Sequence, residues 1–154
     1  MNGADPEPLD EVDLQALEAL EATVDPPKFS SAMPADCPLD GALDAHGGVY
    51  RLVKTNPPTA DDFLSVFELG SDIPAGRACE CHGLSLFRDS EDAEAYADKF
   101  PHLGEFIAAA TLTPELGKIA ETPRNFRGTL ISHATWWPYE DVQREVPFVV
   151  KAIE

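Results

Sequence analysis

Short apolar segments separated by turn residues begin near residue 48 and continue along the rest of the chain. The first, VYRLV at residues 49–53, is rich in β-branched and aromatic side chains, which is typical of a strand. Side chains alternate between the two faces of a strand, so we expect Tyr50 on one face and Arg51, among valines, on the other. The prolines of TNPPT end this strand.

The segments that follow predict a mixture of helices and strands. Residues 60–69 are expected to be helical because Thr59 and Asp62 form a capping-box pattern before an apolar run that would bury Phe63, Val66 and Phe67. A second helix is expected at residues 91–100, capped by Asp89 or Ser90, and a polar helical turn at 139–145. Strands are expected at 83–87, 104–113, 117–121, 128–137 and 146–153. This order predicts an α+β fold, a single small domain with a mostly antiparallel sheet and two or three helices.

The composition changes near Gly47 and divides the chain into residues 1–46 and 47–154. The first part holds eleven acidic side chains and one lysine, and we interpret it as an acidic N-terminal extension. Leucines spaced by three and four predict a helix at about 10–24, followed by a Pro-rich linker. This helix carries Asp13, Glu18 and Glu21 on its polar side. Its apolar stripe would dock either on its own domain or on a separate basic protein.

The net charge of −17 argues against binding of nucleic acid or of an anionic membrane by the surface as a whole. No signal peptide is expected, and the longest apolar run, FIAAA, is too short to span a bilayer. Three cysteines are an odd and sparse set, which favours a reducing compartment and predicts a cytoplasmic protein. Cys79 and Cys81 lie close to His82, but a second pair of ligands is missing, so no metal site is predicted.

Five side chains are candidates for a functional site. A strand arginine among apolar residues needs a carboxylate or phosphate partner, so Arg51 forms either an internal salt bridge or the contact to an anionic ligand. Ser85 precedes a helix N-terminus and is either a sheet serine or a ligand contact. His133 is either a packed residue or part of the site. Adjacent tryptophans on a strand face opposite ways, so Trp136 or Trp137 is expected to line a groove or an interface.

The layout of a strand arginine, a Gly-Leu-Ser strand before a capped helix, and a polar residue on a late strand resembles ADP-ribosyltransferase-like folds. This resemblance implies that Arg51 grips the dinucleotide, that Ser85 supports the nicotinamide side, and that NAD is the cofactor. His133 stands where the family has a Glu or Gln. The segments YRLVKTNPPTADDFLS, GLSLF, FPHLGEFIA and SHATWW are also similar to a family of small uncharacterised bacterial proteins, a similarity that implies no activity.

Two functions remain open from the sequence. The first is an acidic interaction protein that binds a basic protein partner through Asp13, Glu18 and Glu21. The second is an ADP-ribosyltransferase-like domain that binds or cleaves NAD or a related nucleotide. In that case Tyr50 or a tryptophan would stack on the base. Whether the protein is an enzyme is not decided by these patterns.

Overall fold

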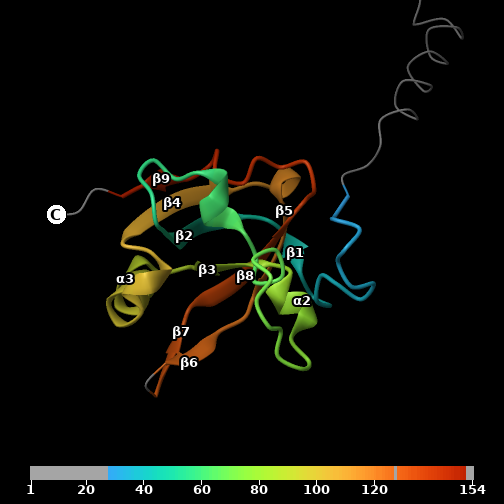
Figure 1. Cartoon of the computed structure of the whole chain (residues 1–154), viewed down its shortest axis with the longest axis horizontal. Helices are drawn as coiled ribbons and strands as arrows, with labels where there is room; N and C mark the ends of the chain where they lie inside the picture. The colour runs from blue at the N-terminus through green and yellow to red at the C-terminus, as the bar shows by residue number, and fades with distance from the viewer. Residues whose placement is uncertain (1–27, 127, 152–154) are drawn as a thin grey trace, which may run out of the picture.

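The computed structural model describes residues 28–126 and 128–151, and this part of the chain is built on an antiparallel sheet (Figure 1). Seven strands follow one another across the sheet in the order β1-β5-β8-β3-β2-β4-β9, and every neighbouring pair is antiparallel. A separate pair, β6 and β7, forms a hairpin that projects from the sheet. The predicted small domain with a mostly antiparallel sheet is confirmed for the described residues.

The elements have the following bounds. The strands are β1 (Leu43–Asp44), β2 (Gly47–Val53), β3 (Leu84–Phe87), β4 (Phe106–Leu112), β5 (Gly117–Glu121), β6 (Arg124–Phe126), β7 (Thr129–Ile131), β8 (His133–Pro138) and β9 (Val149–Val150). The α-helices are α2 (Ala78–Cys81) and α3 (Ser90–Lys99). Three single turns of 3-10 helix are η1 (Ala60–Phe63), η2 (Pro101–Leu103) and η3 (Pro114–Leu116).

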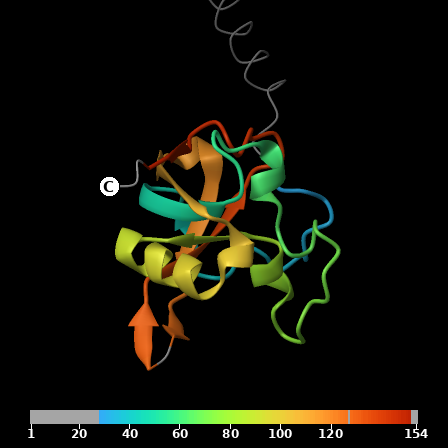
Figure 2. The same ribbon diagram turned by 60° about the vertical axis from the view of Figure 1, so that its left-hand side comes forward.

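Apolar side chains cover both faces of the central strands. On one face, Leu84 and Trp136 are at most 1 % exposed and pack with Phe63 and Phe148. On the other face, Phe87 packs with residues of α3 and of the neighbouring strands. Figure 2 shows α3 in front of the strands on this second side. Because both faces of β3 and β8 are covered, a side chain on either face is buried unless the cover is interrupted.

Helix α3 forms where the sequence predicts it. The Asp89 side chain accepts a hydrogen bond from the backbone N–H of Glu91 at 2.9 Å, which satisfies one free donor of the first turn. Asp92 accepts two hydrogen bonds from Ser132, one from its backbone N–H at 2.8 Å and one from its hydroxyl at 2.7 Å. The helix is therefore fixed to the segment between β7 and β8.

The helix predicted at residues 60–69 is wrong in extent, because only the single turn η1 forms. The Thr59 N–H donates to Asp62 Oδ2 at 3.0 Å, as the capping pattern suggests. Beyond Phe63, however, the Ser65 hydroxyl accepts from the Glu68 N–H at 3.1 Å, and Glu68 Oε1 accepts from the Ser65 N–H at 2.9 Å. These bonds occupy backbone donors that a longer helix would use. Val66 and Phe67, expected in the core, are about two-fifths exposed, at 39 % and 40 %.

The C-terminal part also contains less regular structure than expected. The polar residues 139–145 form turns instead of a helical turn, and the strand predicted from residue 146 is reduced to the two residues of β9. Val146 is 65 % exposed, so this part of the expected strand does not pack into the core.

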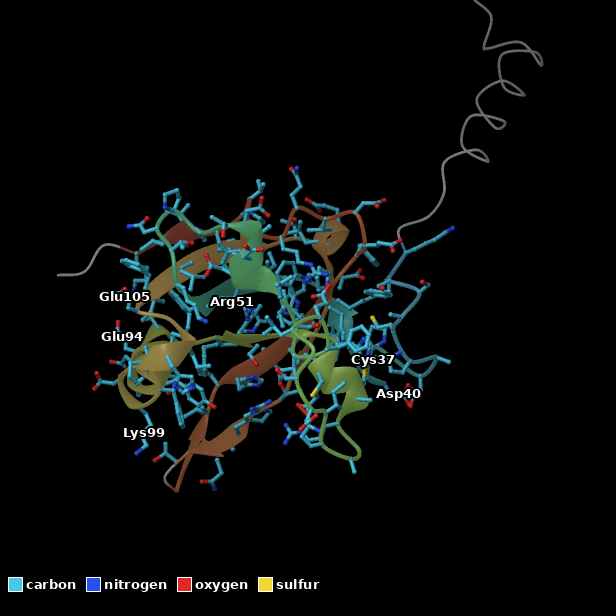
Figure 3. The ribbon with its side chains drawn as sticks, viewed as in Figure 1. Cys37, Asp40, Arg51, Glu94, Lys99 and Glu105 are labelled. Carbon is cyan, nitrogen blue, oxygen red and sulfur yellow. A yellow bond between two sulfur atoms is a disulfide. The ribbon has the colours of Figure 1, made fainter. Side chains whose placement is uncertain are left out.

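Residues 28–46 lie against the sheet although their composition assigns them to the extension. Leu43 pairs with Ile119 of β5, and Cys37 is joined to Cys79 of α2 by a disulfide (Figure 3). The odd and sparse set of cysteines thus includes one disulfide, and the cysteine argument for a reducing compartment loses its basis. Cys81 is the free thiol. The helix expected at 10–24 lies outside the described residues.

Candidate functional site

Strands β2 and β3 separate soon after they meet. They form a single residue pair, Tyr50 with Phe87, whereas β2 pairs with β4 along its whole length. A cavity of about 490 Å³ opens at this separation, and both strands contribute to its wall. Ligand sites in proteins commonly have volumes of about 300–1,000 Å³. The fold therefore provides a ligand-sized space in the middle of a sheet that is otherwise covered on both sides.

Arg51 lies at this separation, inside the fold (Figure 3). Its Nε donates to the Asp62 carbonyl oxygen and its Nη1 to the Ser85 carbonyl oxygen, both at 2.9 Å. Its guanidinium lies over the Phe63 ring, 5.3 Å from the centroid. Among the described residues no carboxylate forms an ion pair with it. Of the two alternatives for this arginine, the internal salt bridge does not form in this part of the chain.

The charge of Arg51 is poorly compensated by the protein. Burial lowers the pKa of Arg51 to about 10; the nearby Asp62 raises it and the nearby Arg144 lowers it. The Asp62 carboxylate instead accepts bonds from the Lys54 N–H at 2.8 Å, the Thr59 N–H at 3.0 Å and the Thr55 hydroxyl. Burial opposes ionisation of Asp62, but these hydrogen bonds outweigh burial and leave its pKa below the ordinary value.

Two further arginines, Arg77 and Arg124, line the same cavity. Arg77 pairs with Glu80 at 3.2 Å, and Arg124 lies 3.8 Å from the same carboxylate, so one acid is shared between two cations. The buried Nε of Arg124 has no hydrogen-bond partner among the described residues. The lining of this cavity therefore holds three arginines against two carboxylates, Asp72 and Glu80, in a chain of strongly negative net charge.

Ser85 and His133 lie next to each other on β3 and β8, on the face opposite Leu84. His133 Nε2 lies 2.9 Å from Ser85 Oγ, and His133 Nδ1 lies 3.1 Å from the Thr122 carbonyl oxygen and 2.9 Å from the Thr122 hydroxyl. A carbonyl oxygen can only accept, which favours the tautomer with the proton on Nδ1. His133 Nε2 then accepts a hydrogen bond from the Ser85 hydroxyl.

His133 is only 2 % exposed, whereas Ser85 is exposed on the cavity wall. Burial and then the charge of Arg124 lower the pKa of His133 to about 4, although its bond to the Thr122 carbonyl acts in the opposite direction; Arg77 lowers it further. The imidazole is therefore neutral at physiological pH, with its Nε2 lone pair directed at the serine.

The structure brings Arg51, Ser85 and His133 to one cavity and places the other candidates elsewhere. Trp136 and Trp137 are both fully buried, so the expectation that one lines a groove is wrong. Their Nε1 atoms donate to the carbonyl oxygens of Leu116 at 3.0 Å and Cys79 at 2.9 Å, respectively. Other parts of the protein pack on both faces of β8. The sequence of this strand alone does not show whether one face or both faces are buried.

Tyr50 does not line the cavity; its ring lies under Lys151 Nζ, 5.2 Å from the centroid. The aromatic residues on the wall are Phe87 and Tyr96, which sequence reasoning did not select for the site, nor did it select Arg77 or Arg124. Asp13, Glu18 and Glu21 lie outside the described residues. No group of three or more potential metal-ligating side chains occurs in residues 28–126 and 128–151.

Comparisons with known proteins supply no function for this cavity, so a function has to be argued from its geometry. No protein-family model, curated protein or solved structure matches the chain. The similarities to ADP-ribosyltransferase-like folds and to the small bacterial family therefore stay predictions. Within the part of the chain that the structure describes, no helix has the length and apolar character needed to cross a membrane.

Proposed function

We propose that this domain binds a small phosphate-bearing molecule, NAD or a related nucleotide, in the cavity between β2 and β3. The observation that carries the proposal is Arg51, a half-buried guanidinium on the cavity wall whose described partners are two carbonyl oxygens and an aromatic ring. Even partial burial of a cation without an anionic partner is unfavourable, and a ligand phosphate would offset this. Such a ligand would also raise the lowered pKa of Arg51.

The other walls of the cavity suit a ligand with both charged and flat apolar parts. Arg77 and Arg124 add positive charge, which the carboxylates of Glu80 and Asp72 on the same wall offset only in part. Phe87 and Tyr96 supply aromatic surface on the side of α3. A nucleotide has phosphates that could contact the arginines and a base that could contact the aromatic side chains.

Calorimetric titration of NAD, ADP-ribose and inorganic phosphate into the full chain tests this proposal. Arg51→Gln is expected to weaken nucleotide binding roughly 10- to 100-fold, because charge-assisted hydrogen bonds are lost. Arg88→Gln is the matched control. Arg88 also donates to two carbonyl oxygens, those of His46 at 2.8 Å and Gly48 at 3.2 Å, but it does not line the cavity.

Saturable binding by wild type and Arg88→Gln, at least about tenfold weaker with Arg51→Gln, would support the proposal. No heat with any of the three ligands at millimolar concentration, or equal binding by both variants, would contradict it. Where NAD binds, release of nicotinamide measured by chromatography decides whether the ligand is also cleaved, as the ADP-ribosyltransferase resemblance predicts.

The net charge of −17 supports a second candidate function, binding of a basic protein partner by the acidic N-terminal segment. Immobilised polylysine is a suitable probe for the full chain. Joint replacement of Asp13, Glu18 and Glu21 by their amides should weaken binding more than joint neutralisation of three exposed acids elsewhere, Asp61, Glu94 and Asp98. Equal weakening by the two sets would show only a general charge effect.

A further inference from the structure

A hydroxyl and an imidazole on the cavity wall and a carbonyl behind them lie in series. Ser85 Oγ lies 2.9 Å from His133 Nε2, and His133 Nδ1 lies 3.1 Å from the Thr122 carbonyl oxygen. An activated serine requires two hydrogen bonds: one from the nucleophile to a base, and one that holds the base in place through a third group. The serine is exposed to the cavity while the imidazole is buried, so a ligand would meet the hydroxyl first.

The imidazole is prepared to accept a proton from Ser85. The Thr122 carbonyl favours the proton on Nδ1, and burial keeps the ring neutral at physiological pH, so Nε2 has a free lone pair. A neutral ring with a lowered pKa is a weak base in the resting protein. Negative charge that develops beside the ring during a reaction favours its protonated form and strengthens it as a base.

Positive charge is available beside the serine. Arg51 Nη1 donates to the carbonyl oxygen of Ser85 itself, at 2.9 Å, and Arg124 lies close enough to His133 to lower the pKa of the ring. Fixed cations near a reacting carbonyl stabilise the oxyanion that forms on it. They also favour substrates that carry a negative charge.

We propose that Ser85 is a nucleophile with His133 as its general base, and that the cavity hydrolyses esters of small anionic acids through an acyl-serine. This activity goes beyond nucleotide binding, although it uses the same cavity. Ser85 Oγ forms a bond to the acyl carbon while its proton moves to His133 Nε2. The bond from the acyl carbon to the alcohol oxygen breaks, and the alcohol leaves with that proton. Water then attacks the acyl-serine, giving the free acid and restoring Ser85.

A fluorophosphonate probe tests the nucleophile without knowledge of the substrate. Its phosphorus forms a bond to Ser85 Oγ, the bond from phosphorus to fluorine breaks, and fluoride leaves. Incubated at pH 7.5, the full chain should gain one adduct, and peptide mass spectrometry should place it on Ser85. Ser71 is an internal control, because it is exposed like Ser85 but, among the described residues, no histidine nitrogen forms a hydrogen bond with its hydroxyl.

Three variants separate catalysis from mere accessibility. Ser85→Ala should abolish the adduct, and His133→Gln should slow its formation roughly 100-fold or more, since general-base catalysis contributes about 10²–10⁴. Arg88→Gln changes a residue that does not line the cavity, so labelling should stay within about threefold of wild type. Near-ultraviolet circular dichroism checks that each variant is folded.

An unlabelled wild-type chain, or a folded His133→Gln variant labelled at the wild-type rate, would overturn the proposal. Should His133→Gln fail to fold, the wild-type comparison of Ser85 with the equally exposed Ser71 still decides it. The two proposals fail separately, because labelling requires no nucleotide and the NAD titration requires no nucleophile.

Discussion

Arg51 Nη1 donates a hydrogen bond to the Ser85 carbonyl oxygen at 2.9 Å, across the point where β2 and β3 separate. In a continuous antiparallel pair this oxygen would face a backbone N–H of the neighbouring strand. The guanidinium takes the place of that donor and brings a positive charge with it. Arg51 thus provides a hydrogen-bond donor for the carbonyl oxygen that the strand separation leaves unpaired. The same side chain lines the cavity at that separation.

Arg51→Lys should reduce the free energy of unfolding by roughly 2–3 kcal/mol, because a lysine cannot reproduce the planar fork that reaches both carbonyl oxygens. Urea unfolding followed by tryptophan fluorescence measures the change. An unfolding free energy within 0.5 kcal/mol of wild type, on the scale of ordinary surface substitutions, would mean that the two hydrogen bonds contribute little.

Asp62 is expected to be essential for the position of Arg51, whereas its neighbour Asp61 is not. Asp62→Ala removes the acceptor for the backbone of Lys54 and Thr59 and should cost roughly 2–4 kcal/mol of stability. It should also weaken NAD binding, because the Asp62 carbonyl oxygen that holds Arg51 Nε would no longer be fixed. Asp61→Ala, at an exposed adjacent site, is the control and should change neither quantity.

The pH dependence of stability should report the buried His133. Its native pKa of about 4 lies below the ordinary value of 6.5, so between these values the unfolded chain binds a proton that the native protein does not. Stability from this group is complete above pH 6.5 and falls by roughly 3 kcal/mol as the pH drops through 4. Asp62 and Glu68, whose pKa values are also lowered, lose stability in the same direction.

A comparison with His133→Gln isolates the histidine contribution, since both proteins share the carboxylates. The difference in unfolding free energy between wild type and His133→Gln should shrink as the pH falls from 7 to 4. A difference that stays constant over this range would show that His133 titrates normally.

The disulfide predicts one reactive thiol in the unreduced, denatured chain and three after reduction. Cys37 and Cys79 are 42 residues apart, and closing a loop of this size stabilises the native state by about 4 kcal/mol. Reduction should therefore lower the unfolding free energy by a similar amount. Cys81→Ser is the control and should leave both the disulfide and the stability unchanged. Three titratable thiols without reductant would contradict the pairing.

The local signals in the sequence predicted the local structure well. The β-branched run around Arg51, the Asp89 cap and the apolar alternation at Ser85 each correspond to an observed element. The helix after Pro58 was overestimated because side chains such as Glu68 bond to the backbone there, and such competition depends on tertiary contacts.

The site was predicted in part, and for a definable reason. Arg51, Ser85 and His133 were selected as polar residues within apolar strands, and all three line the cavity. Arg124 lies at the base of the projecting hairpin and Arg77 in a loop, and neither stands out in its own segment. Which residues meet is decided by the strand order β5-β8-β3-β2, and sequence periodicity does not determine that order.

The cavity gathers three arginines beside two carboxylates in a protein of net charge −17, and this contrast bears on the anionic ligand proposed for it. At physiological ionic strength charges are screened beyond about 8 Å, so an approaching anion meets repulsion only in the last few ångströms before the arginines attract it. A small anion crosses that zone with few charges, whereas a polyanion such as nucleic acid brings many against the acidic surface. For the small anionic ligand proposed above, this predicts that added salt speeds capture while weakening retention.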